Sequence, residues 1–300
     1  MSEGTFAGVR RDGRATEGLG RPRRRWTRAR IRRWIISIVL IPICLIWVYP
    51  MLWMVSSSFK TNGEIFQGLN PVPNIIQLGN YITAWVQADI GRDFLNSVLI
   101  ALGGVAVVLV VTSMMGYVVG RYPFPGRKAL IAVLAVIVFL PQGFTILPIL
   151  EEVTWLHLNG SLFGIILAES GSVHTVQILL FAGYFAQLPP ELEESATVDG
   201  AGFLRVFWQI YLPLAKPVVA TVVILQFIAS WNDFLIPLVL TLTHPELRPL
   251  AVGVYTFQGT NQVQWADLTA ASTIALLPIL VVFLFLQRYF IEGIAGAVKQ

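Results

Sequence analysis

Long stretches of this chain contain almost no charged residues, and they limit its possible folds more than any other feature. A helix needs about 20 mainly apolar residues to cross the hydrocarbon core of a bilayer. Six runs of about that length or longer occur, at residues 34–57, 94–118, 129–150, 162–187, 217–242 and 268–288. Strands of a membrane barrel would be about half as long and would alternate between apolar and polar residues. The sequence therefore predicts an all-α, polytopic membrane protein with six transmembrane helices.

The composition argues against a soluble alternative. Hydrophobic residues make up 55% of the 300 residues and charged residues 13%, whereas about 25% charged residues is usual in soluble domains. A soluble core could not cover so much apolar surface with so few charges. Cys44 is the only cysteine, which excludes a disulfide scaffold and a cysteine-based zinc site. The three histidines are scattered along the chain, so we expect no metal site and no catalytic residue.

The basic residues indicate the orientation, because cytoplasmic loops of membrane proteins carry an excess of Lys and Arg. With the N-terminus inside, 18 of the 21 basic residues face the cytoplasm, and three, Lys60, Arg92 and Arg248, face outward. We therefore expect a multi-pass protein of the cell membrane with both termini in the cytoplasm.

Eleven arginines lie in residues 1–33, a basic cytoplasmic arm that precedes a transmembrane domain at 34–300. A basic run of this kind can bind nucleic acid. Here it adjoins the first apolar run, so contact with anionic lipid of the bilayer is the favoured interpretation and no nucleic-acid partner is expected. A cleaved signal peptide is disfavoured, because the uncharged run at 34–59 is longer than the apolar core of such peptides.

The predicted cytoplasmic loop at 189–213 contains the signals of a helical hairpin. Pro189 and Pro190 suit a helix start, and three glutamates follow in the first turn, at the positive end of the helix dipole. Gly200 can adopt a positive φ and end that helix. A second amphipathic segment should then place four apolar residues on one face: Phe203, Val206, Phe207 and Ile210.

The first of these helices should present a face of mostly small groups. This face is formed at helical spacing by Leu192, Ser195, Ala196 and Asp199. Small side chains let another backbone approach closely, as a docking element for a partner protein requires. An ordinary amphipathic hairpin lying in the membrane interface explains the same pattern equally well.

A motif in this loop separates the two interpretations. The loop reads Glu194-Ser195-Ala196-x-x-Asp199-Gly200-Ala201 and then Ile210-x-Leu212-Pro213. This pattern resembles the EAA loop of binding-protein-dependent ABC importer permeases. Serine replaces the usual alanine at position 195 and is still small.

Segments elsewhere in the chain also resemble known proteins, namely carbohydrate permeases of the maltose-system type, second-permease branch. These segments are Ser58-Phe59-Lys60, Asn80-Tyr81, Phe94-x-Asn96-Ser97, Tyr117-x-x-x-Arg121-x-x-Phe124-x-Gly126, Trp231-Asn232-Asp233-Phe234-Leu235 and Gly293-x-x-Gly296-Ala297-Val298-Lys299.

The resemblance implies a type I ABC importer permease fold and a subunit that hydrolyses nothing itself. Its partners would be a second permease, two cytoplasmic ATPase subunits that bind ATP and Mg, and an extracytoplasmic solute-binding protein. The chain would bind no cofactor, and it contains no phosphate-binding loop of the G-x-x-x-x-G-K-[ST] type. The motif residues would couple it to the ATPase, with Glu194 bonding a basic or backbone donor there.

Polar residues inside the predicted spans are candidates for a substrate pathway, because such groups are costly in a membrane. In the fifth span Gln226, Ser230 and Asp233 form one stripe along a helix. In the fourth span Glu169 is followed by Ser-Gly-Ser and by His174, a composition that predicts locally unwound backbone.

Gln177 shares a helix face with His174 in that fourth span. For both spans, hydrogen bonding between helices competes with solute contact and is slightly favoured.

Two other functions remain open from the residues alone. An intramembrane enzyme would have to use Glu169, His174 and Asp233, which show no nucleophile–base spacing. A membrane scaffold or sensor could use the hairpin to bind a soluble partner. The sequence leaves the solute open among disaccharides, oligosaccharides, amino sugars and glycerol phosphate esters.

Overall fold

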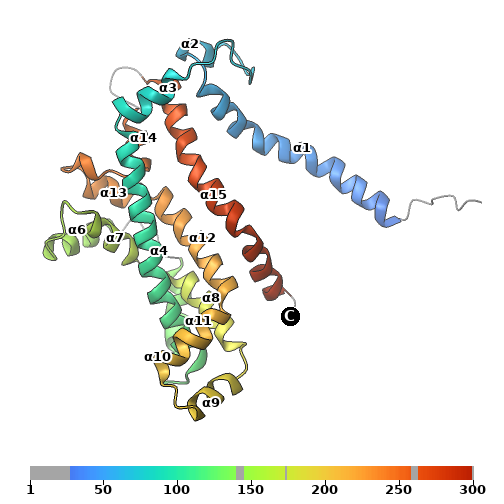
Figure 1. Cartoon of the computed structure of the whole chain (residues 1–300), viewed down its shortest axis with the longest axis vertical. Helices are drawn as coiled ribbons and strands as arrows, with labels where there is room; N and C mark the ends of the chain where they lie inside the picture. The colour runs from blue at the N-terminus through green and yellow to red at the C-terminus, as the bar shows by residue number, and fades with distance from the viewer. Residues whose placement is uncertain (1–27, 140–144, 173, 258–262, 299–300) are drawn as a thin grey trace, which may run out of the picture. The chain divides into compact units, whose positions relative to one another are not determined.

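The computed structural model describes residues 28–139, 145–172, 174–257 and 263–298. In this part of the chain every regular element is helical and none is a strand, which confirms the predicted all-α class (Figure 1). Most of the basic arm, residues 1–27, lies outside the described residues, as does Lys299 of the C-terminal motif. The chain divides into two units, residues 1–50 and 51–300.

Three helices contain segments long and apolar enough to cross a membrane: α1 (Arg28–Ser57), α4 (Ile90–Arg121) and α15 (Trp265–Val298). The other predicted spans fall on shorter helices, which are α5 (Arg127–Ile137), α6 (Ile146–Trp155), α7 (Leu162–Ser170), α8 (Thr175–Ala186), α12 (Lys216–Asn232) and α13 (Leu235–Leu240). Helices α7 and α8 meet at 60° and together could form one broken span. Helix α12 and the short helices before it meet at 82° and could form another. The described residues thus contain three to five candidate spans, and a count of six stays a prediction.

Besides the run that forms α7 and α8, two of the predicted spans are not continuous helices. In the run at 129–150, α5 ends at Ile137 and α6 begins only at Ile146. The sequence between them includes Pro141, which cannot donate a helical hydrogen bond. In the run at 217–242, α12 ends at Asn232 and the next residue has an extended backbone with ψ 131°. Pro237 supplies no N–H to the carbonyl four residues earlier, which favours a break at this point.

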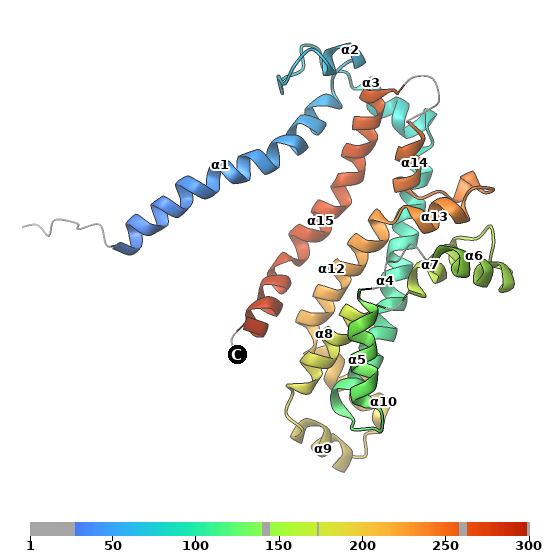
Figure 2. The same cartoon turned by 180° about the vertical axis from the view of Figure 1, so that it is seen from behind.

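Short helices fill both ends of the larger unit. One end contains α2 (Asn62–Ile65), α3 (Gly79–Ile82), the π-helix η1 (Thr83–Gln87), the 3₁₀ helix η4 (Pro245–Leu247) and α14 (Leu250–Thr256). The other end contains the hairpin, with α9 (Glu191–Val198), α10 (Phe203–Val206), the π-helix η3 (Phe207–Tyr211) and α11 (Leu212–Leu214). Helix α4 runs between the two ends (Figures 1 and 2).

Helix α4 is the central element of this unit and packs along α7, α8, α12 and α14. Glycines on α4 permit the close contacts, as small residues do between membrane helices. A Cβ added at Gly120 would lie 2.6 Å from the carbonyl oxygen of Ala182 on α8. A Cβ added at Gly104 would lie 2.9 Å from the hydroxyl of Ser230 on α12. The glycines of α4 therefore set how closely its neighbours approach.

Polar side chains of α4 hold the segment that follows α13. The amide of Asn96 donates to the backbone carbonyls of Glu246 and Arg248, both at 2.9 Å. The hydroxyl of Ser97 accepts from the backbone N–H of Leu250 at 2.7 Å. The Phe94-x-Asn96-Ser97 motif therefore fixes one outward-predicted loop to the central helix.

The two long loops predicted to face outward also meet each other. The Asn62 side chain donates to the side-chain oxygen of Gln264 at 2.7 Å and accepts from the backbone N–H of Ala266 at 2.8 Å. The rings of Phe66 and Trp265 pack edge to face, with centroids 5.7 Å apart. These contacts join the segment after α1 to the start of α15.

Candidate functional site

The loop between α8 and α12 folds as the predicted helix, glycine turn and helix. Helix α9 begins directly after Pro190 and ends at Val198. Gly200 has φ +80°, a backbone conformation that residues with a Cβ rarely adopt. Beside it, the N–H of Ala201 bonds the carbonyl of Ala196 at 2.9 Å and closes the helix end. The local signals in the sequence therefore set both ends of this helix.

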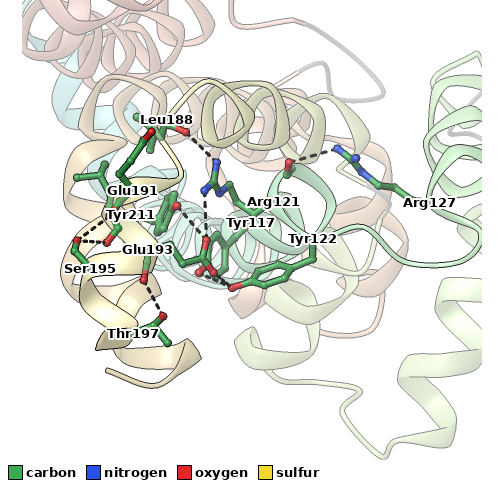
Figure 3. Close-up of polar contacts among 12 residues, drawn as sticks. Tyr117, Arg121, Tyr122, Arg127, Leu188, Glu191, Glu193, Ser195, Thr197 and Tyr211 are labelled. Carbon is green, nitrogen blue, oxygen red and sulfur yellow. Dashed lines mark hydrogen bonds and ion pairs between the residues drawn. The ribbon is translucent and has the colours of Figure 1, made fainter. Parts of the chain in front are cut away.

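A cluster of polar contacts around Glu193 attaches α9 to the end of α4 (Figure 3). The Arg121 guanidinium donates to the carbonyl of Leu188 at 2.9 Å and lies 3.4 Å from the Glu193 carboxylate. The hydroxyl of Tyr211 donates to the same carboxylate at 3.2 Å, and the hydroxyl of Tyr122 does so as well. One carboxylate therefore connects α4, α9 and η3.

An aromatic cluster lies beneath this carboxylate. The ring of Tyr117 is fully buried, with its centroid 4.8 to 5.8 Å from the rings of Tyr211, Phe203, Phe207 and Phe185. Its hydroxyl lies 3.0 Å from that of Tyr122. Burial, and then the hydrogen bond to Glu193, raise the pKa of Tyr122, so this phenol stays protonated as a donor. The hairpin is therefore held by packed rings as well as by charge.

Sequence reasoning did not identify Glu193 as an anchor. Its three partners are Arg121 and Tyr122, at the end of α4, and Tyr211, and all of them are remote from Glu193 in sequence. The sequence contained one signal for this anchor: Tyr117 and Arg121 are four residues apart and therefore share one face of α4.

The outward side of α9 is exposed. Glu194, Ser195 and Asp199 are exposed, and the apolar side chain of Val198 is 87% exposed. Ala196 points the opposite way and is buried in the core beneath the hairpin. The predicted common face of small groups is therefore divided, because adjacent helix positions differ by about 100° and the core takes only Ala196.

The second helix of the hairpin differs from the prediction at its first residue, where Phe203 is 44% exposed, and in its last turn. Val206 and Phe207 are buried as expected, but Tyr211 is the next fully buried residue, and Ile210 is only partly buried. The reason is the π-helical turn η3, which adds a residue to the turn and shifts the buried face. The other motif positions are Ala201 and Leu212, partly buried against the core, and Pro213, which is exposed.

A cavity of about 990 Å³ lies between α6, α7, α8, α12 and α13. All six polar residues predicted for a substrate pathway line it, namely Glu169, His174, Gln177, Gln226, Ser230 and Asp233. The sequence placed them in two separate spans, and the fold brings these residues to one space. Their role stays a prediction.

The walls of this cavity are broken helices. Helix α7 ends at Ser170 and α8 begins at Thr175, which confirms the predicted interruption of this span. A ring nitrogen of His174 lies 3.2 Å from the carbonyl of Ser170 at that break. On the opposite wall, α12 ends at Asn232 and Asp233 has an extended backbone. Both breaks therefore leave backbone polar groups next to the cavity.

The chain resembles known transport proteins over most of its length. Residues 112–296 match the family model of the binding-protein-dependent transport system inner membrane component. The diacetylchitobiose uptake system permease protein NgcG of Streptomyces coelicolor is 32% identical, over 89% of this chain and 87% of that protein. The arabinooligosaccharides transport system permease protein AraQ of Bacillus subtilis is 31% identical, over 90% of this chain and 96% of that protein.

A solved structure shares the fold of this chain. A chain of a bacterial ABC transporter involved in the import of the acidic polysaccharide alginate superposes with a TM-score of 0.75 and 25% sequence identity. The match covers 88% of this chain and 98% of that one. The family model, the relatives and the fold therefore lead to one conclusion: this chain is a multi-pass membrane protein that belongs to the family of binding-protein-dependent transport system inner membrane components, the permeases of ABC importers.

Proposed function

We propose that this chain is the translocation subunit of an ATP-driven importer that moves a sugar or sugar-like solute into the cytoplasm. The observation that carries the proposal is the hairpin at 189–213. One side of α9 is fixed to the central helix through Glu193, while its other side presents Glu194, Ser195 and Val198 to the surroundings. An element with one anchored side and one exposed side can transmit the movement of a partner to the rest of the chain.

In this proposal the exposed side of α9 docks on a separate cytoplasmic ATPase. Val198 supplies the apolar contact, and Glu194 bonds a basic or backbone donor of that partner. Movement of the ATPase then displaces the hairpin. The Glu193–Arg121 contact and the rings around Tyr117 pass the displacement to α4, which packs along the helices that wall the cavity. This chain itself catalyses nothing and binds no cofactor, and the partner holds ATP and Mg.

The full assembly contains this chain, a second permease of the same fold and two ATPase subunits. A solute-binding protein, which the family description requires, delivers the solute from the side opposite the hairpin. The chain lies in the cell membrane with both termini in the cytoplasm, because 18 of its 21 basic residues then face inward. The names of the relatives support a carbohydrate as the solute.

The docking role is tested by changing the exposed apolar residue of α9. Val198→Asp should weaken copurification of the ATPase with the permease pair about tenfold or more, because a charge replaces an apolar contact at the centre of the interface. Val198→Ile is the matched control, since it keeps an apolar side chain, and it should bind normally. Gly200→Val provides a second variant, because valine is strained at a φ of +80°.

Both disruptive variants should reach the membrane in normal amounts, since Val198 and Gly200 are exposed. A full ATPase complement together with normal solute uptake in Val198→Asp and Gly200→Val would show that the hairpin is not the docking element.

A further inference from the structure

The second half of the hairpin, residues 203–214, has an apolar side that lies open to the surroundings. Leu204 is 55% exposed and Trp208 is 46% exposed. They are four residues apart, so they share one side of the helix formed by α10 and η3. Phe203 and Leu214, at the two ends of this segment, are each 44% exposed. Neighbouring apolar side chains of this kind mark a contact with another protein or with a membrane.

The other sides of the same helix have clear surroundings. Val206, Phe207 and Tyr211 are buried in the core beneath the hairpin. Arg205 and Gln209, again four residues apart, are exposed and polar. The helix therefore has a core side, an open apolar side and a polar side, whereas a helix at the surface of a soluble domain needs only the first and the last. A helix that packs on its own protein and also lies in a membrane interface needs all three.

The direction of residues 203–214 is that of a helix on a membrane surface. Helix α12 packs along α4 and α15, two helices long enough to cross a bilayer (Figures 1 and 2). The segment meets α12 at 82°, so it lies nearly perpendicular to the crossing helices. The 17 residues of α12 are themselves within the length of about 17–25 residues that a crossing helix needs. The hydroxyl of Tyr184 on α8 donates to the carbonyl of Leu214 at 2.8 Å and fixes the end of the segment.

The charges of the hairpin are separated in a way that matches an anionic membrane surface. All four acidic residues of the loop at 189–216 lie within 191–199, and both basic residues, Arg205 and Lys216, lie beyond them. Both are exposed, and neither forms an ion pair within the part of the chain that the structure describes. Anionic lipid attracts basic side chains near the bilayer surface and repels carboxylates. A bilayer therefore attracts the second half of the hairpin and leaves α9 in the water.

We propose that residues 203–214 form an interfacial helix in the leaflet at the hairpin end of the molecule. Leu204 and Trp208 lie among the upper parts of the lipid chains, while Arg205 and Lys216 bind anionic phospholipid headgroups. The bilayer thus holds the second half of the hairpin, as the partners of Glu193 hold the first. This contact depends only on the membrane location of the family, so it goes beyond the importer function and is independent of it.

The depth of the two exposed sides is tested with a fluorophore in the complete importer. Leu204→Cys and Gln209→Cys are made separately in a Cys44→Ser background, which removes the only native cysteine of this chain. The other subunits are free of cysteine, and each thiol is labelled with the same dye in nanodiscs of phosphatidylcholine and phosphatidylglycerol. A lipid with a nitroxide near the top of its acyl chain should quench the dye at 204 severalfold more than the dye at 209. Iodide in the water should quench in the reverse order.

The same measurement separates lipid from protein partners. Equal quenching of the two dyes by the nitroxide lipid, or quenching of both by iodide alone, would overturn the proposal. If the dye at 204 is shielded from iodide only while the ATPase is bound, the ATPase covers this side and the proposal is wrong. If neither quencher reaches that dye with or without the ATPase, another part of the permease pair covers it, and the proposal is also wrong. The expected quenching needs no ATPase, so its failure is distinguishable from lost copurification in Val198→Asp.

The headgroup contact is tested by lipid composition. Phosphatidylglycerol added to phosphatidylcholine nanodiscs should increase the lipid quenching at Leu204→Cys, because anionic headgroups hold the basic side chains at the surface. Arg205→Gln combined with Lys216→Gln should abolish this increase. Lys128→Gln is the matched control, since Lys128 is an exposed lysine on α5, outside the segment, and the increase should remain. An increase that survives in the double variant, or that the control loses equally, contradicts the proposal.

Discussion

Three glutamates in one turn of α9 have different environments although their chemistry is the same. Glu193 lies inward and receives contacts from Arg121, Tyr122 and Tyr211. Glu191 and Glu194 lie on the outer surface. The difference arises from rotation of about 100° per residue along the helix, which turns only one of the three toward α4. The inward glutamate holds the hairpin, and the outer pair is available to a partner.

Replacing the inward carboxylate should loosen the hairpin without removing it. Glu193→Gln keeps the size of the side chain but weakens its charge-assisted hydrogen bonds. Each hydrogen bond to a charged group stabilises a folded protein by about 1.5–3 kcal/mol, and the contribution at Glu193 is smaller because this side chain is partly exposed. We expect solute uptake per ATP hydrolysed to fall severalfold in the reconstituted importer, measured from parallel transport and phosphate-release assays. Glu191→Gln, on the exposed side of the same turn, should leave the ratio unchanged. Equal ratios in both variants would remove Glu193 from the coupling path.

At the scale of helices, close packing of α4 against α8 depends on the missing side chains of glycine. Gly116 and Gly120 both face α8. A Cβ at Gly116 would clash with Phe181, and one at Gly120 with the backbone of Ala182. Backbone atoms cannot move aside as a flexible side chain can, so a methyl group there must separate the helices. The rings that hold the hairpin lie at the same end of α4, so this packing also supports the hairpin.

A pair of glycine-to-alanine changes tests this packing. Gly120→Ala should destabilise the protein by about 1–3 kcal/mol, the usual cost of overpacking a core, and should lower the melting temperature of the detergent-purified importer. Gly183→Ala on α8 is the control, because nothing lies within 4 Å of an added Cβ there. It should be neutral, or stabilising by up to about 1 kcal/mol, since alanine is the better helix former. A melting temperature unchanged by Gly120→Ala would mean that α4 and α8 are less tightly packed than described.

At the scale of the whole molecule, the charge asymmetry and the fold make one joint prediction. The hairpin and the long loops lie at opposite ends of α4 (Figures 1 and 2). The basic residues predict that the hairpin end faces the cytoplasm, since the loops at 121–128 and 189–216 together carry five of them. The loop at 60–93, with two basic residues, should then face outward.

Impermeant thiol reagents can measure this orientation in a Cys44→Ser background. Val72→Cys, at an exposed site in the long loop, should be labelled by an impermeant maleimide in intact spheroplasts. Val198→Cys, at the end of α9, should be labelled only in inverted membrane vesicles, prepared without the ATPase subunits because the proposed docking would cover this site. The reverse pattern would invert the topology, and labelling of both sites in spheroplasts would indicate leaky preparations rather than either orientation.

Much of the fold follows from local properties of the sequence. Apolar runs and the charges between them indicate a polytopic helical protein, because burial in lipid depends on each segment by itself. Pro190 and Gly200 mark the ends of α9 because they act through their own backbone angles. The residues after Glu169 predict the break between α7 and α8 for the same reason. The π-turn at η3 was not predictable, and it moved burial from Ile210 to Tyr211.

The sequence by itself determined the class of the protein, its family and the position of the hairpin at 189–213, because each depends on residues close together in the chain. Only the tertiary structure decided which side chains meet. Glu193 finds Arg121 across 72 positions, and Glu169 shares a cavity with Gln226 although they lie on different helices. Such contacts depend on how closely the helices pack, which is set by glycines of α4 and by the breaks in α7–α8 and α12–α13, and no local pattern contains that information.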